Sequence, residues 1–146
     1  MKIAVRYQSR GGNTKAVAEA IASATGVKAE PASVPIDGPV DILFVGGGVY
    51  KWDIDDSLKN CLKKLAPATV RSIAAFSTAG GMDGAKKIAA IAKEKGIHVH
   101  DETLPIKVGL RNHAALGREG TIELTDKQIR SVNSFARNVT QNESRE

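Results

Sequence analysis

The segment from residue 8 to residue 14 carries the clearest chemical signal in this sequence. It contains small polar residues and two glycines, follows a short apolar run at 2–7, and precedes a strongly helical pattern. Backbone N–H groups at a helix N-terminus attract an anion, and glycine lets the backbone approach it closely. This order of strand, glycine loop and helix predicts a phosphate site, to which Ser9 and Thr14 can donate hydroxyl groups. The alternative is a simple turn.

Two further glycine loops follow apolar runs. Residues 46–53 contain three consecutive glycines and then Tyr50 and Trp52, in a chain with one Trp and two Tyr. The glycines leave room for a planar group on which an aromatic side chain can stack. Packing of Trp52 on the following helix is the alternative. Residues 77–83 also join a strand to a helix, either as donors of backbone N–H groups to a ligand or as a turn in which Asp83 caps the helix.

The rest of the chain supplies the elements that position these loops. Five apolar runs alternate with amphipathic segments, which predicts an α/β fold with a parallel sheet covered by helices on both faces. The expected strands are 2–7, 27–34, 41–46, 72–77 and 97–108. The expected helices are 13–25, 54–65, 83–95 and 125–140.

Proline positions predict the order of the strands. Pro31 and Pro35 interrupt the second run and Pro105 interrupts the fifth, whereas the other three runs contain no proline. Because proline cannot serve a central ladder, the second and fifth strands belong at the edges. The predicted fold is therefore a doubly wound five-stranded parallel sheet of order 2-1-3-4-5.

In such a sheet, ligands bind beyond the carboxyl ends of the strands, where the three glycine loops are expected to meet. The helix starts are marked as well. Asp53, Asp55 and Asp56 open the second helix, as the helix dipole favours. Thr125 and Gln128 predict a capping box at the start of the last helix.

Composition and charge narrow the function classes. The formal net charge is +5, but Lys and Arg are dispersed and aromatic residues make up only 4%, which argues against nucleic-acid binding. No apolar run approaches membrane-spanning length, and strand-like sequence starts at residue 2, so neither a membrane partner nor a signal peptide is expected. The single Cys61 fits a reducing compartment and is predicted to be a core thiol. These features predict one cytoplasmic domain over 1–146.

The residues that several other functions require are not found in this sequence. The first loop has neither of the glycine motifs of nucleoside triphosphatases and dinucleotide folds. It has no Cys for a tyrosine phosphatase and no acidic residues for a response-regulator receiver. His98, His100 and His113 lack partners at metal-ligand spacing, and no nucleophile stands beside a base. His98 and His100 share a strand face and are predicted to be structural. We therefore expect no metal and no catalytic residue.

The segment from Ser9 to Thr14 resembles the T/S-x-T-G-N-T phosphate loop of flavodoxins. The resemblance to the flavodoxin-like family, in its short-chain form, covers nearly the whole chain and is strongest over 1–24. It implies non-covalent FMN, with the flavin carrying the redox chemistry. The resemblance implies phosphate binding by Ser9, Arg10, Gly11, Gly12, Asn13 and Thr14. It implies ring contacts by Gly48, Val49, Tyr50 and Trp52, and contacts to the polar edge of the ring by Ser77, Thr78, Ala79, Gly80 and Gly81.

Two departures from the family pattern shape the expected partner and affinity. Gly11 stands where the family usually has Thr or Ser, which removes one phosphate hydroxyl. Electron-carrier flavodoxins are typically acidic, whereas the charge of +5 favours an acidic redox partner protein. The irregular segment 109–120 is either its docking loop or a solvated connector, and it carries Arg111, His113 and Arg118.

The expected function is electron transfer by an FMN-binding, flavodoxin-like protein. Two alternatives stay open. One is a small flavin-dependent reductase or oxidase that acts directly on a substrate, related to the flavodoxin-like protoporphyrinogen oxidases, although their extra loop is not found here. The other is a domain that kept the fold and lost FMN.

Overall fold

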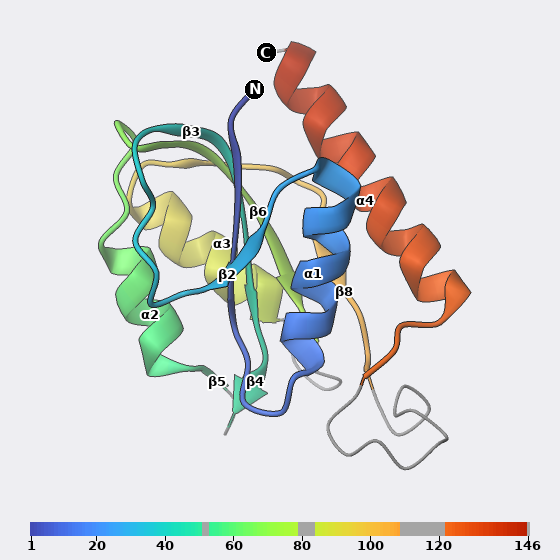
Figure 1. The fold of residues 1–146 in the computed structure, drawn as a ribbon. Helices are drawn as coiled ribbons and strands as arrows, with labels where there is room; N and C mark the ends of the chain where they lie inside the picture. The colour runs from blue at the N-terminus through green and yellow to red at the C-terminus, as the bar shows by residue number, and fades with distance from the viewer. Residues whose placement is uncertain (51–52, 79–83, 109–121, 146) are drawn as a thin grey trace.

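The computed structural model of this chain describes residues 1–50, 53–78, 84–108 and 122–145 (Figure 1). Within these residues the strands are β1 (Ile3–Gln8), β2 (Ala29–Pro31), β3 (Val40–Gly47), β4 (Val49–Tyr50), β5 (Asp53–Ile54), β6 (Val70–Ser77), β7 (His98–Val99) and β8 (Leu104–Pro105). The helices are α1 (Asn13–Thr25), α2 (Asp56–Lys63), α3 (Gly84–Glu94) and α4 (Asp126–Arg145).

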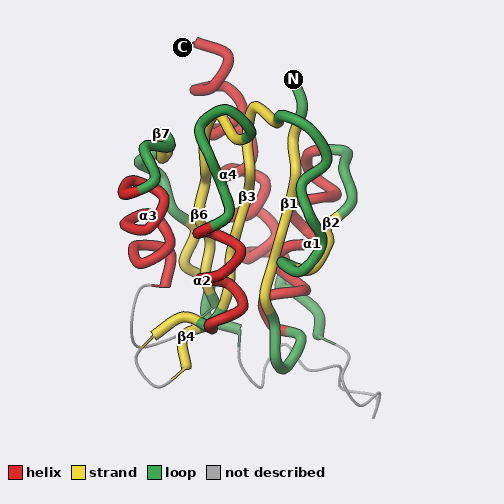
Figure 2. Tube along the Cα trace, turned by 90° about the vertical axis from the view of Figure 1, so that its left-hand side faces the viewer, coloured by secondary structure: helices red, strands yellow, loops and turns green. Residues whose placement is uncertain are grey.

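The main sheet is parallel and runs in the order β2-β1-β3-β6-β7, with β8 also paired to β6. Figure 2 shows β6, β3 and β1 side by side. The predicted order 2-1-3-4-5 is confirmed, because β6 is the fourth strand of this series and β7 and β8 share the fifth position. Pro31 and Pro105 lie in edge strands, as the sequence predicted. The short antiparallel hairpin β4–β5 was not predicted.

The fifth strand is interrupted where the sequence predicted one continuous run over 97–108. The His100 N–H donates to the Ile73 carbonyl at 2.9 Å, and the Ile106 N–H donates to the Ser77 carbonyl at 2.8 Å. An advance of six positions from His100 to Ile106 therefore matches an advance of four along β6, and residues 101–103, between β7 and β8, leave the ladder. Pro105 has no N–H to donate, which weakens the pairing further.

Alternating side chains of the central strands build two cores. Phe44 of β3 faces α1 and α4, and its ring meets that of Phe135 edge to face at a centroid distance of 5.7 Å. Leu43 and Val45 point to the opposite face, where Leu58 of α2 and the helix α3 cover the sheet. Figure 1 shows α1 and α4 on one side of the sheet and α2 on the other. The prediction of helices on both faces is confirmed.

A buried polar cluster fixes α4 near the amino ends of the strands. Ser72, His100 and Glu143 are all at least 95% buried. Glu143 Oε1 lies 3.1 Å from His100 Nε2 and accepts a hydrogen bond from the Ser72 hydroxyl, while Arg71 Nε faces the other carboxylate oxygen at 3.3 Å. The apolar pattern of α4 ends at Val139, so the sequence predicted a helix end near residue 140. The helix instead continues to Arg145, and the buried Glu143 lies in this additional turn.

The predicted caps are confirmed at Asp55 and at the start of α4, whereas Asp53, which the sequence placed at the opening of the second helix, lies in β5. The Asp55 side chain is the N-cap of α2 and accepts from the Ser57 N–H. Thr125 and Gln128 form the reciprocal bonds of a capping box, at 2.9 and 3.2 Å. Cys61 packs against the core but is only half-buried, and burial raises the pKa of its thiol. Among the described helices, none combines the length and apolar character needed to cross a membrane.

Candidate functional site

The three glycine loops leave the sheet at neighbouring points. β1, β3 and β6 end at Gln8, Gly47 and Ser77, and the sheet register pairs Gln8 with Gly47 and Gly47 with Ser77. Each loop therefore begins within one strand spacing of the next, at the carboxyl edge of the sheet. The predicted meeting of these loops is confirmed at the points where they leave the strands.

The N-terminus of α1 is open. Its N-cap residue is Gly12, whose φ of 91° lies in the left-handed region that favours glycine. No side chain caps this end, and the first turn contains no acidic residue. Ser9 Oγ accepts a hydrogen bond from the Gly12 N–H at 3.0 Å, which closes the loop ahead of the helix. A helix start with neither a side-chain cap nor a carboxylate can receive an anion.

Thr14 and Asn13 tie this helix start to the rest of the site. The hydroxyl oxygens of Thr14 and Thr78 lie 2.8 Å apart, and both side chains are buried. The Asn13 amide donates to the Val108 carbonyl at 3.3 Å. The structure thus brings residues of the first and third loops, and the end of the fifth strand segment, into direct contact.

Ser77 carries a polar atom that lacks a partner. Its side chain is fully buried, and its Oγ has no hydrogen-bond partner among the described residues. It lies at the carboxyl end of β6 beside Gly84, where a Cβ would come within 3.3 Å of the Ser77 Cβ and 3.0 Å of Val49 Cγ2. A buried hydroxyl without a partner costs about 1–3 kcal/mol, so a ligand that reaches it would recover that energy.

The glycines of the second loop have a different role from the one the sequence suggested. A Cβ at Gly46 would lie 2.3 Å from the Phe76 ring, and a Cβ at Gly47 would lie 2.6 Å from Leu58 Cδ2. Core side chains therefore fill the space beside both glycines. The proposal that three glycines leave room for a planar ligand is wrong for these two.

The hairpin β4–β5 follows directly. Val49 pairs with Ile54, and Tyr50 pairs with Asp53 across its two strands. Asp53 forms ion pairs with Lys59 of α2 and, at 3.5 Å, with Lys87 of α3. The hydrogen bond from Lys59 is the main cause that lowers the pKa of the Asp53 carboxyl. These contacts anchor the hairpin to both helices on its face of the sheet.

One contact joins the first loop to the start of α2. Arg10 Nη2 and Nε lie 2.8 and 2.9 Å from Asp55 Oδ2. The Ser57 hydroxyl and N–H, and then Arg10, lower the pKa of the Asp55 carboxyl. Sequence reasoning assigned Arg10 to phosphate and Asp55 to the helix start, and it missed the pair. Their positions in two loops at one sheet edge were the available signal.

Several predicted site residues lie outside the described residues: Trp52, Ala79, Gly80, Gly81, Arg111, His113 and Arg118. Asp83, the alternative cap of α3, also lies outside them. Among the residues that are described, no group of three His, Cys, Asp or Glu side chains has an arrangement that could hold a metal ion.

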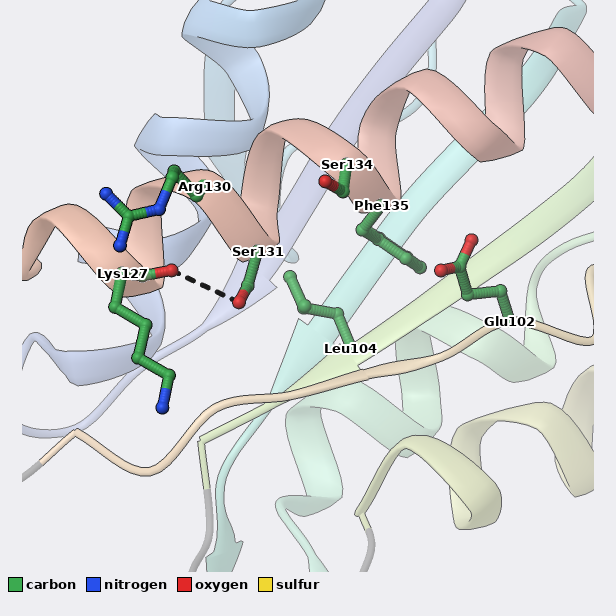
Figure 3. A pocket seen from close by; sticks show the side chains of 7 residues that line it. All are labelled: Glu102, Leu104, Lys127, Arg130, Ser131, Ser134 and Phe135. Atoms are coloured by element: carbon green, nitrogen blue, oxygen red, sulfur yellow. Dashed lines mark hydrogen bonds between the residues drawn. The ribbon is translucent and has the colours of Figure 1, made fainter.

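A separate hollow of about 510 Å³ lies between β8 and α4 (Figure 3). Leu104 and Phe135 form its apolar floor. The Ser131 hydroxyl donates to the Lys127 carbonyl within α4, and the Glu102 carboxylate accepts from Asn138 at 3.3 Å. The Ser131 hydroxyl and the Glu102 carboxylate thus both bond to groups of α4, and the hollow is part of the contact between this helix and the segment of β8.

Comparisons with known proteins place the fold. No family model matches this chain, and no curated protein sequence matches it. A flavodoxin from the domain Archaea aligns over 99% of both chains with a TM-score of 0.75 and 22% identity. Flavodoxin 2 from Bacillus cereus aligns over 97% of this chain and 99% of its own, with a TM-score of 0.73 and 14% identity.

The same fold also occurs as part of longer proteins. The chain aligns over 98% of its length with rubredoxin oxygen:oxidoreductase from Desulfovibrio gigas, at a TM-score of 0.74 and 15% identity, and spans 36% of that protein. This chain therefore has a flavodoxin-like fold, and the match extends over nearly its whole length.

Proposed function

We propose that this chain binds FMN without a covalent bond and acts as an electron-transfer flavoprotein. The observation that carries the proposal is the open N-terminus of α1, which has a left-handed Gly12, no side-chain cap and no acidic residue in its first turn. A phosphate group fits such a helix start, because uncapped N–H groups and the helix dipole both favour an anion.

The remaining donors also fit a flavin. The buried Ser77 hydroxyl, unpaired among the described residues, lies where the polar edge of the ring is expected. In the proposal, the phosphate is held by Ser9, Gly11, Gly12, Asn13 and Thr14. The ring is lined by Gly48, Val49, Tyr50 and Trp52, and its polar edge faces Ser77, Thr78, Ala79, Gly80 and Gly81. When bound, FMN supplies the electron transfer, and the chain binds and orients it.

The deciding experiment is an absorbance spectrum of the purified protein before and after addition of FMN. We expect a visible flavin spectrum that shifts on binding, and tighter binding of FMN than of riboflavin in parallel titrations. Riboflavin lacks the phosphate, so equal or tighter binding of riboflavin would contradict the phosphate site. No binding of either flavin would favour the alternative of a domain that has lost FMN.

The second alternative is a reductase or oxidase that acts alone on a substrate. Steady turnover of a small electron acceptor by the FMN-loaded chain, without any partner protein, would favour it. Rapid reduction by a partner protein together with negligible turnover alone supports the carrier function that we propose.

We further propose that the redox partner is acidic. The net charge is +5, and near the site the carboxylates of Asp53 and Asp55 are each held by a cation. Such a surface attracts a negatively charged protein and repels a basic one. The rate of electron transfer from candidate partners should fall steeply as ionic strength rises, and a flat salt dependence would contradict this proposal.

A further inference from the structure

We propose that Arg10 is a positioning residue, which clamps the phosphate loop to the start of α2, and is not a ligand of the phosphate. This inference rests on the proposed function, because it concerns the same flavin site. It assigns to Arg10 and Asp55 a joint role: they hold the phosphate loop and the hairpin β4–β5 at a fixed separation.

The contacts of the two side chains show that Asp55 is held in place more firmly than Arg10. Two guanidinium nitrogens of Arg10, Nη2 and Nε, contact the same carboxylate oxygen, Asp55 Oδ2, at 2.8 and 2.9 Å. The other oxygen, Oδ1, accepts from the Ser57 N–H at 2.9 Å and from the Ser57 hydroxyl at 2.5 Å. Asp55 is therefore fully engaged, and its side chain is only 12% exposed, whereas that of Arg10 is 57% exposed.

This asymmetry favours the pair over a contact between Arg10 and phosphate. If Arg10 turned toward a phosphate group, the Asp55 carboxylate would keep its bonds from Ser57 but lose its cation. The open start of α1 already offers uncharged donors to the phosphate, so the phosphate gains little from Arg10 that would offset the lost ion pair. The phosphate can thus be bound while Arg10 stays with Asp55.

The position of the pair gives it a mechanical consequence. Arg10 and Asp55 are 45 residues apart in sequence, and the hairpin β4–β5 directly precedes Asp55. The ion pair therefore links the loop proposed to hold the phosphate to the end of the hairpin proposed to line the ring. Breaking this link should loosen the whole site, and both FMN and riboflavin should bind less tightly by the same factor.

The test compares Arg10→Gln, Asp55→Asn and the double variant with the unmodified protein. Asn is as good an N-cap as Asp, so Asp55→Asn removes the charge of the pair and keeps the cap of α2. Lys15→Gln is the control, because Lys15 is a cation in the first turn of α1 that is 55% exposed and pairs only weakly, at 4.0 Å, with Glu19. Dissociation constants for FMN and riboflavin are measured by flavin fluorescence.

We expect each single variant to weaken binding of both flavins by the same factor, about two- to fivefold for a partly exposed ion pair. The double variant should lose no more than the weaker-binding single variant, because one link is broken in all three. A loss confined to FMN in Arg10→Gln would overturn the proposal and make Arg10 a phosphate ligand. Unchanged affinity for both flavins in Arg10→Gln would overturn it as well.

A second measurement separates this proposal from the proposed function. The melting temperatures of the same four proteins are compared without flavin. A clamp predicts that each single variant melts about 1–3 °C lower and that the double variant melts no lower than the less stable single variant. Additive losses would overturn the clamp. This result is obtained even if no flavin binds, an outcome that would contradict only the proposed function.

Discussion

Two buried serines of one strand differ in their hydrogen bonding at the two ends of the sheet. Ser72 and Ser77 both lie in β6, and both are fully buried. Near the amino end, the Ser72 hydroxyl contacts the Asp41 carbonyl at 2.8 Å, His100 Nε2 at 3.2 Å and the Glu143 carboxylate. At the carboxyl end, the Ser77 hydroxyl has no partner among the described residues.

The helix starts give a second contrast, this time within the carboxyl end of the sheet. α2 and α4 begin there with side-chain caps, whereas α1, which begins beside the phosphate loop, has none. A polar group that is left unpaired in a folded protein lowers stability, so it persists where another molecule supplies the partner. The comparison teaches that polar groups at the carboxyl end fall into two sets: side chains paired within the fold, and the Ser77 hydroxyl and the uncapped start of α1, which are open to a ligand.

The largest effect should come from breaking the amino-end cluster. His100→Ala removes a partner of the buried Glu143 carboxylate and is expected to lower the free energy of unfolding by about 2–4 kcal/mol. Denaturant unfolding measures this change. His98→Ala is the matched control, because the two rings are neighbours at 5.4 Å and His98 is exposed. A loss in His100→Ala no larger than that of the control would contradict a stabilising cluster.

Substitution by Ala should change the stability of the flavin-free protein in opposite directions at the two serines. Ser72→Ala leaves polar partners unpaired and should destabilise the flavin-free protein by about 1–3 kcal/mol. Ser77→Ala removes an unpaired hydroxyl and should leave stability unchanged or raise it, while flavin affinity falls. Unfolding and titration of both variants check this pair of signs. Destabilisation by Ser77→Ala of the same size as by Ser72→Ala would remove the distinction between the two ends.

At the open helix start, Thr14→Ala should weaken FMN binding by about 1–3 kcal/mol, because the proposed phosphate loses a hydroxyl donor and the Thr78 hydroxyl loses its partner. Riboflavin affinity should fall less, since that flavin has no phosphate. Thr25→Ala is the control, because Thr25 lies at the opposite end of the same helix and its hydroxyl bonds to the helix backbone. Equal FMN affinity in Thr14→Ala and the unmodified protein would refute the role.

The architecture could be predicted from the sequence, because the patterns that specify it lie within short segments of the chain. Proline-free apolar runs mark the central strands, and Pro31 and Pro105 mark the edges, which together specify the strand order. The capping box of Thr125 and Gln128 was likewise recognisable, since both residues lie within one helical turn. The residues of the first loop could be proposed as a phosphate site for the same reason.

The contacts that shape the site could not be predicted, because they join residues far apart in sequence. From the sequence alone, Arg10 is a cation in a loop and Asp55 is a helix cap. Their pairing depends on the spacing of two strands. The filling of space beside Gly46 by Phe76 depends on the register between β3 and β6. Glu143 lies beyond the apolar pattern of α4, so its burial left no periodic signal.

The smallest expected effect is a pH dependence of the contact between Arg10 and Asp55. The pKa of Asp55 lies below its ordinary value of 3.8 in the folded protein, chiefly because of the hydrogen bonds from Ser57 and also because of Arg10. A carboxyl group with a lowered pKa adds stability above its unfolded pKa, and this stability is lost as pH falls through the folded pKa.

The difference in stability between the unmodified protein and Asp55→Asn should therefore be constant from about pH 5 to pH 8, at less than about 1 kcal/mol, and should shrink below about pH 4. Thermal melts of both proteins across this range give the difference directly, because other carboxyl groups titrate in both and cancel. A difference that changes between pH 6 and pH 7 would contradict this assignment, because the pKa of the Asp55 carboxyl is lowered from an ordinary value of 3.8. A change confined to acid pH would assign the dependence to the contact between Asp55 and Arg10, and would separate it from the amino-end cluster.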